Sequence, residues 1–413
     1  MKVALLGNMN NNHFTVARYL RDNNIDVNLL LFDNDYKHFH PSNDSFTKEY
    51  QKFCFNLNWG SGESFLRTSS QKIRNDLSEY DIIIGCGSSP AFCYKGNIKL
   101  NIFRPYGGDI YGMVKYKLLF KRNKSVKNLK LIKNRKKRSL TDDFSILQMM
   151  YFQRKGIKHV DIFNMPLTNH TYENQFKKHA KVVTRWKDYP PLVYSPEYTD
   201  NNINKQIEDL KWFDFFRKIR NENKLIIFSH SRHQWTNKVQ DISQKGNDKL
   251  IIAYSNFIKE RKISSKLILF EYGEDVTASK ELISRLGISS KVIWCPKMSR
   301  KEIMIGIKFS DLVCGEFSHS WLIGGTICEA LAMSKPLISY RDKSSLYYKD
   351  LDLYKIFNSY SHEEITKSFI TYLESPNKFQ KIAGENKIWY EKKIVEPFLI
   401  KHLKYFNSLN IEK

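Results

Sequence analysis

The fold class is decided by residues 2–32, "KVALLGNMNNNHFTVARYLRDNNIDVNLLLF". An apolar run at 2–7 leads into a polar loop, then an amphipathic stretch from residue 15, then a second apolar run at 26–32. Short apolar runs bounded by polar loops are typical of strands buried on both faces, and a helical stretch between them predicts a βαβ unit. We therefore expect an α/β domain with helices on both faces of a parallel sheet. Further strand-like runs follow at 80–86, 99–104, 159–165 and 180–186.

The alternating pattern breaks at residues 189–206, "YPPLVYSPEYTDNNINKQ", which are rich in Pro, Asn and Asp. Such a composition predicts a domain boundary, and a second alternating series starts with the strand-like run 224–231. A chain of 413 residues is long enough for two domains. We expect two Rossmann-like, doubly wound domains facing a cleft, at residues 1–200 and 201–390. A C-terminal helix at 391–413 is expected to cross back to the first domain.

The composition indicates an anionic partner. Lys and Arg outnumber Asp and Glu by 67 to 43, for a formal net charge of +24. Such a surplus suits phosphorylated small molecules, nucleic acid or an acidic membrane face, and the alternative is a solvated basic surface without one partner. The six cysteines form no CxxC pair and read as buried free thiols in a reducing compartment. No apolar run reaches a membrane span or forms a signal peptide, so we expect a cytoplasmic protein.

Residues 315–340, "GEFSHSWLIGGTICEALAMSKPLISY", place two glycines before a helix that carries one carboxylate. A helix N-terminus offers unpaired N–H groups to phosphate, and Gly324 and Gly325 permit close backbone approach before Thr326. Glu329, one turn further on, is expected to accept hydrogen bonds from ribose hydroxyls. The alternative is a carboxylate that only complements the helix dipole.

Two cations are candidates for binding a diphosphate. Arg232 follows the strand-like run 224–231, where open α/β sheets bind ligands, and Lys245 precedes the next helical stretch. A fixed cationic pair can neutralise a leaving nucleoside diphosphate without a metal ion. In so basic a chain, two ordinary surface cations are the competing interpretation. The neighbouring side chains that could also donate to phosphate oxygens are Ser229, His230 and Ser231.

The segment "FRPYGGDIYG" gives the best candidate in the first domain. Asp109 follows a Gly-Gly turn at the end of a strand-like run, where an acceptor hydroxyl could meet a catalytic base. The alternative is an aspartate that caps the next helix. His13, at the end of the first loop, reads as a helix-start residue.

Metal and dinucleotide chemistry are disfavoured. Asp33 and Asp35 match a DxD metal motif, but acidic residues are common after the second strand of such a unit. The loop "GNMNNNH" lacks the G-x-G-x-x-G pattern of dinucleotide sites, and the pair His38 and His40 is too short and isolated for a metal site. We expect neither a metal nor a cofactor.

The second half resembles a known family. The segments "HSR…QKGNDKLIIAYSNF", "KVIWCPKMSRKEI", "FSDLVCGE" and "ICEALAMSKPLISY" occur in the order seen in GT-B glycosyltransferases of the family-4 type, including enzymes of bacterial surface polysaccharide and lipopolysaccharide synthesis. The resemblance covers about residues 224–340 well and the N-terminal half loosely. It implies metal-independent transfer of a sugar from a UDP- or GDP-sugar to a glycan or lipid-linked glycan, with the nucleotide at Gly324 to Glu329.

The family's pair of glutamates eight residues apart is broken in this chain. Trp321 stands where the first glutamate is expected, although related members replace that residue too. Glu316 or His319 is expected to take over its role, and Glu316 is the second catalytic candidate beside Asp109. The departure leaves the donor sugar and the stereochemistry of transfer open.

The stretch from Lys115 to Arg138 carries twelve Lys or Arg and no acid, with leucines at rough helical spacing. A basic amphipathic stretch suits an anionic membrane surface or a lipid-linked acceptor. RNA and a solvated loop are the alternatives, and no RRM or KH signature accompanies it. Two rival functions remain for the whole chain: a nucleotide-sugar epimerase of the same fold, and a basic nucleic-acid-binding α/β protein.

Overall fold

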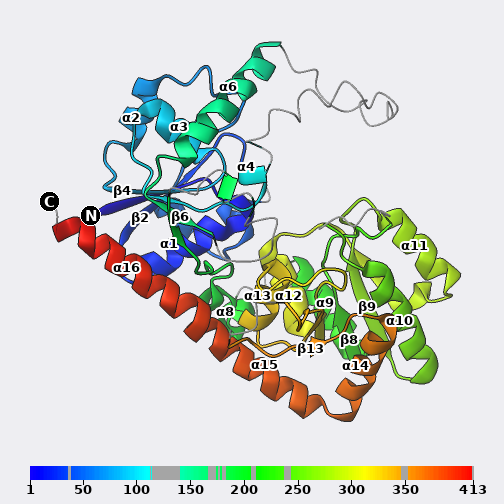
Figure 1. Ribbon diagram of the computed structural model, residues 1–413. Coiled ribbons are helices and arrows are strands. Elements are labelled where there is room, and N and C mark those ends of the chain that lie inside the picture. The colour runs from blue at the N-terminus through cyan, green and yellow to red at the C-terminus, as the bar shows by residue number, and fades with distance from the viewer. Residues whose placement is uncertain are drawn as a thin grey trace. The chain divides into compact units, whose positions relative to one another are not determined.

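The computed structural model describes residues 1–35, 39–111, 113, 140–165, 174, 177–178, 183–205, 211–236, 243–345 and 352–411. They form two compact units, each described by itself (Figure 1). Unit 1 comprises Met1–Ser42, Thr47–Pro190 and Pro397–Lys413, and unit 2 comprises Asn43–Phe46 and Pro191–Glu396. The main segment of unit 2 thus starts at Pro191, whereas the sequence analysis placed the boundary after residue 200. The chain returns to unit 1 at Pro397.

Unit 1 is built on a seven-stranded parallel sheet with the order β3-β2-β1-β4-β5-β6-β7. Its central strand β1 pairs with β2 and β4, with Val3 opposite Val27 and Ile82. The order confirms the expected doubly wound sheet. The strands are β1 (Lys2–Leu6), β2 (Asp26–Leu31), β3 (Cys54–Asn56), β4 (Ile82–Gly85), β5 (Ile102–Phe103), β6 (Ile162–Asn164) and β7 (Thr184–Trp186).

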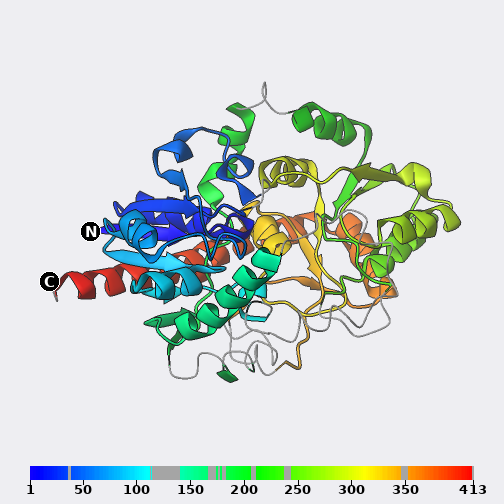
Figure 2. The ribbon, with the colours of Figure 1, turned by 90° about the horizontal axis from the view of Figure 1, so that it is seen from above.

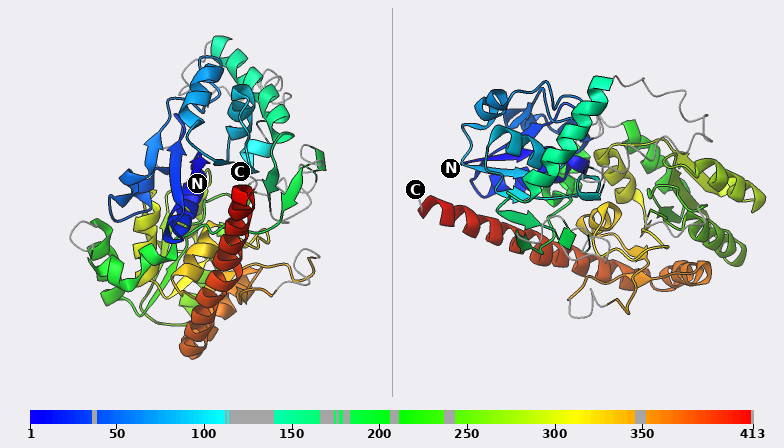
Figure 3. Two further views of the ribbon diagram at one scale, coloured as in Figure 1. Left: turned by 90° about the vertical axis from the view of Figure 1, so that its left-hand side faces the viewer. Right: turned by 45° about the horizontal axis from the view of Figure 1, so that its top comes forward.

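Helices cover both faces of this sheet (Figures 2 and 3). The helices α1 (Asn12–Asp22) and α16 (Glu396–Ile411) pack on the face of Val3 and Leu5. The opposite face is covered by α2 (Ser70–Leu77), α3 (Ser89–Gly96) and α6 (Leu140–Ile157). Alternate side chains of one strand therefore enter two separate cores, as the period of two in a strand requires.

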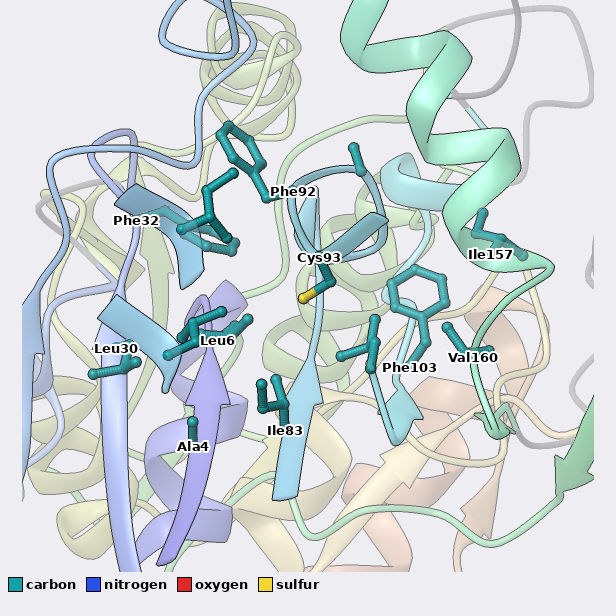
Figure 4. Close-up of a cluster of buried hydrophobic side chains, with 14 of the residues drawn as sticks. Ala4, Leu6, Leu30, Phe32, Ile83, Phe92, Cys93, Phe103, Ile157 and Val160 are labelled. Carbon is teal, nitrogen blue, oxygen red and sulfur yellow. The ribbon is translucent and has the colours of Figure 1, made fainter. Parts of the chain in front are cut away.

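Figure 4 shows the second of these cores. Ala4 and Leu6 of β1 lie beside Ile83 of β4, and Phe92 of α3 packs over them with Ile157 of α6 nearby. All five side chains are buried. This packing holds the carboxyl ends of the strands, and the loops that follow them, in fixed positions.

Unit 2 repeats the architecture with a six-stranded parallel sheet in the order β10-β9-β8-β11-β12-β13. Because the strand order reverses between β8 and β11, the crevice for a ligand is expected at their carboxyl ends. The strands are β8 (Leu225–Phe228), β9 (Ser265–Phe270), β10 (Val292–Cys295), β11 (Leu312–Cys314), β12 (Leu337–Ser339) and β13 (Phe357–Asn358).

One face of the second sheet is covered by α10 (Asn247–Glu260), α11 (Val276–Arg285), α14 (His362–Glu374) and α15 (Pro376–Tyr390). On the other face, α9 (Lys211–Glu222) and α12 (Arg300–Phe309) meet over Phe228, whose ring centroid lies 6.1 Å from that of Phe216. The short helix α13 (Gly325–Ala332) connects β11 to β12.

Three smaller features complete the chain. A 3-10 turn (Ser195–Tyr198) and α8 (Asp200–Lys205) occupy the expected boundary segment, and a π-helical turn (Glu391–Val395) joins α15 to α16. All six cysteines are free thiols. Among the described residues, no helix combines the length and the apolar character needed to cross a bilayer.

Candidate functional site

A pocket of about 190 Å³ lies at the carboxyl end of β11, at the point where the strand order reverses. Its wall includes Glu316, Trp321 and the first turn of α13 from Gly324 to Thr326. Five residues predicted from the sequence therefore line one pocket: Glu316, His319, Gly324, Gly325 and Thr326.

Gly324 keeps this pocket open. Its backbone is extended, with φ −164° and ψ 169°, so the conformation itself does not require glycine. A Cβ atom added there would meet no atom within 4 Å, which means that a side chain would project into open space. The missing side chain thus gives a ligand access to the N–H groups at the start of α13.

Lys245 and Glu316 form an ion pair beside the pocket. Lys245 Nζ donates to Glu316 Oε1 at 2.6 Å, and both side chains are largely buried. The backbone of Lys245 also ties two loops together, since its N–H donates to Gln234 O and its carbonyl accepts from Phe317 N, each at 2.8 Å. The lysine is therefore fixed in place rather than solvated.

Three buried polar atoms around the pocket and its loops have no hydrogen-bond partner within the described part of the chain. They are Glu316 Oε2, Trp321 Nε1 and Arg232 Nε. Buried donors and acceptors are normally satisfied, so these atoms are suited to bind a polar ligand. Arg232 lies in the loop after β8, as predicted.

Glu329 is buried in the second turn of α13, and each of its oxygens already accepts a hydrogen bond. His230 Nε2 donates to Oε2 at 2.5 Å, and Arg300 Nε donates to Oε1 at 3.2 Å. Arg300 continues the network, because its Nη1 donates to Asp44 Oδ2 at 3.0 Å and to Leu192 O at 2.9 Å.

These neighbours determine the charge of Glu329. Burial alone raises the pKa of its carboxyl, but the charges of His230 and Arg300 and the hydrogen bonds that they donate outweigh burial. The pKa therefore falls from 4.5 to about 2, and Glu329 is a carboxylate at neutral pH. The predicted ribose contact of Glu329 stays a prediction.

In unit 1, Asp109 lies at the carboxyl edge of the sheet, on the short helix α4 (Gly108–Tyr111). Its carboxylate accepts N–H groups from Gly107 at 2.8 Å, Tyr106 at 3.0 Å and Gly87 at 3.1 Å. Burial raises its pKa to about 6, although these hydrogen bonds lower it. The three bonds suit the capping interpretation, and the catalytic role of Asp109 stays a prediction.

Two other acidic side chains of unit 1 accept hydrogen bonds from neighbouring residues. Asp33 accepts hydrogen bonds from the N–H and hydroxyl of Ser61, and Asp35 accepts one from the N–H of Phe32. In the ranges that the structure describes, no group of three or more His, Cys, Asp or Glu side chains could hold a metal ion. His38 and the basic residues 115–138 lie outside the described residues.

The fold can now be compared with known proteins. No protein-family model matches the chain, and no curated protein matches it. Solved structures match along its length. Anabaena HepE in complex with UDP-glucose is 14% identical with a TM-score of 0.59, covering 99% of this chain and 100% of that chain. Sucrose-phosphate synthase from Thermosynechococcus elongatus is 11% identical with a TM-score of 0.60, covering 100% of both chains.

The chain has the GT-B fold. A third structure, S. aureus MnaA with UDP, is 10% identical with a TM-score of 0.51 and covers 99% of this chain and 98% of that chain. The fold confirms the architecture that the resemblance implied, two units built on parallel sheets with flanking helices. At these identities the likeness concerns the fold, so the site has to be argued from this chain's own residues.

Two members of the buried network were not predicted. Arg300 begins α12 behind a capping box, in which Ser299 and Glu302 bond each other's backbone, and such a signature marks the helix start but not the partner of its first residue. Asp44 lies more than 250 residues away in the sequence, so no spacing pattern connects the two. The signal available for His230 was its place directly after β8.

Proposed function

We propose that this protein is a glycosyltransferase that moves a sugar from a nucleotide-diphosphate-sugar donor to a hydroxyl group of a glycan or lipid-linked glycan. The observation that carries the proposal is the pocket at the start of α13, where open N–H groups, a fixed lysine and unpartnered polar atoms converge. It lies at the strand-order switch of a GT-B unit, the place where open parallel sheets bind ligands.

In this proposal the diphosphate is bound at Gly324 to Thr326, with Lys245 and Arg232 as its cationic partners. The helix N-terminus stabilises negative charge, and the cations stabilise the charge that grows on the diphosphate as the sugar leaves. Lys245 is held by Glu316, so little reorganisation of this side chain is needed during transfer. This arrangement supports transfer without a metal ion.

The neighbouring structures favour UDP as the nucleotide, because HepE and MnaA were solved with UDP or UDP-glucose. Glu316 Oε2 and Trp321 Nε1 are placed to bind hydroxyl groups of the donor sugar, since one accepts and the other donates. Unit 1, with Asp109, is the proposed acceptor side, and the basic residues 115–138 are a proposed contact with an anionic membrane.

A thermal-shift screen with UDP, GDP, CMP and their sugars tests the proposal, because a ligand at 100 times its Kd stabilises the folded state by about 2.7 kcal/mol. We expect UDP or a UDP-sugar to raise Tm in the wild type and less in Lys245→Gln. Lys355→Gln is the matched control, since Lys355 pairs with Glu385 on the surface. No shift with any nucleotide, together with salt-dependent RNA binding, would refute the proposal. Conversion of a nucleotide sugar without acceptor would indicate the epimerase instead.

A further inference from the structure

Four ionisable side chains form a buried chain beside the first turn of α13: Asp44, Arg300, Glu329 and His230. We propose that Glu329 holds His230 as an imidazolium, and that His230 donates its second N–H to the diphosphate of the departing nucleotide. The inference rests on the proposed function and deepens it. It makes Glu329 a positioning residue that acts through His230.

The cluster is shielded from water. The side chains are 0% exposed for Asp44, 11% for Arg300, 7% for Glu329 and 9% for His230. Arg300 bridges the two carboxylates, and Glu329 Oε2 lies 2.5 Å from His230 Nε2. Charges at such a place interact strongly and are expensive to leave unbalanced.

A charge count decides the state of His230. The cluster holds two carboxylates and one guanidinium, so a neutral imidazole leaves it with one net negative charge. An imidazolium brings the net charge to zero. Because an unpaired buried charge costs several kcal/mol, the protonated state is favoured.

The other groups around His230 leave this balance in place. The ring lies 5.7 Å from that of Phe228 on β8 and 6.3 Å from that of Phe270 on β9, both uncharged. Thr326 Oγ1 on α13 lies 3.4 Å from Nε2 and is also uncharged. In the loop after β8, Arg232 is a cation that opposes protonation. In the loop before α10, Lys245 is paired with Glu316.

The free nitrogen of His230 indicates the ligand. Nδ1 is buried and has no hydrogen-bond partner among the described residues. In an imidazolium this atom carries a hydrogen, so it needs an acceptor. Phosphate oxygens are acceptors only, and the other nitrogen of the same ring, Nε2, lies 3.4 Å from Thr326 Oγ1 at the helix N-terminus where phosphate binding is proposed. A neutral imidazole with hydrogen on Nε2 would present a lone pair to the phosphate instead.

The role in transfer follows from the bonds that change. The bond between the anomeric carbon and the β-phosphate oxygen breaks, and its electron pair stays on the phosphate. The acceptor hydroxyl oxygen bonds to the anomeric carbon, and its proton leaves to a base outside this cluster. His230 keeps its proton throughout and stabilises the charge added to the diphosphate.

NMR of the protein labelled with ¹⁵N-histidine tests the charge of His230 without any nucleotide, and the His230→Asn spectrum assigns its signal. We expect both ring nitrogens to be protonated at pH 7.5 in the wild type. Glu329→Gln should lower the titration midpoint of His230 by at least about one pH unit. Glu374→Gln removes a surface carboxylate that pairs with Arg261, and it should leave the midpoint unchanged.

Addition of UDP tests the contact. We expect UDP to shift the Nδ1 resonance of the wild type, and the high-pH limb of kcat/KM to move down with the His230 midpoint in Glu329→Gln. A neutral His230 at pH 7.5, an unchanged midpoint in Glu329→Gln, or UDP binding without a change at Nδ1 would each overturn the inference. Absence of binding by every nucleotide of the thermal-shift screen would overturn the proposed function instead, and the diphosphate contact with it.

Discussion

At the scale of single residues, Glu329 shows how far side-chain chemistry can be inferred from sequence. Its position after two glycines predicted a helix start, and Gly324 to Thr326 do begin α13. The partners of its carboxylate could not be predicted, because His230, Arg300 and Asp44 come from three distant parts of the chain. Lys245 was likewise predicted as a diphosphate partner, but its ion pair with Glu316 was not predicted.

The ion pairs of Glu329 predict a change in stability in acid. Its pKa is about 2 in the folded protein and 4.5 as its ordinary value, so unfolding below pH 4.5 takes up a proton. The stabilisation is therefore complete above pH 4.5 and is lost as the pH falls towards 2. Urea unfolding measures the free energy of unfolding of the wild type and of Glu329→Gln. We expect the difference between the two to shrink as the pH falls from 4.5 towards 2. A difference that is constant with pH would contradict the ion pairs.

At the scale of elements, strands and helices with strong patterns were predicted and weak ones were not. The apolar runs at residues 2–7, 26–32 and 224–231 became β1, β2 and β8. The two-residue strand β13 (Phe357–Asn358) is too short to leave a periodic signal. Helix α9 was not predicted although Phe213, Phe216 and Ile219 form a buried stripe, because it directly follows the polar boundary segment.

The capping boxes of α12 and α14 provide a matched pair of variants. Ser299 caps the helix that carries Arg300, whereas Ser361 caps α14, which carries no residue of the Glu329 network. Replacing either serine by alanine should lower the unfolding free energy by about 1 kcal/mol. We expect only Ser299→Ala to weaken UDP binding as well, because it loosens the first turn that positions Arg300. Equal UDP affinity in both variants would argue against a role for this turn.

At the scale of the whole molecule, the two-unit α/β architecture was predictable because it rests on many independent apolar runs. The sheet orders of both units confirm it. The site was predictable only in part, since its glycines and cations follow strand ends while its buried network depends on packing. Each GT-B unit thus follows from sequence pattern, and the chemistry at its switch point follows from the tertiary structure.

The most direct test is a calorimetric titration of UDP into the wild-type protein and into Gly324→Val. The valine suits the extended backbone and meets no atom within 4 Å, so the fold should keep its Tm. Gly324 lines the pocket, so we expect the valine side chain to reduce the space that is open to a ligand at the start of α13. We predict that UDP binds the wild type and that Gly324→Val weakens binding by more than about tenfold. Equal affinity in a folded Gly324→Val variant would contradict a nucleotide site at the start of α13.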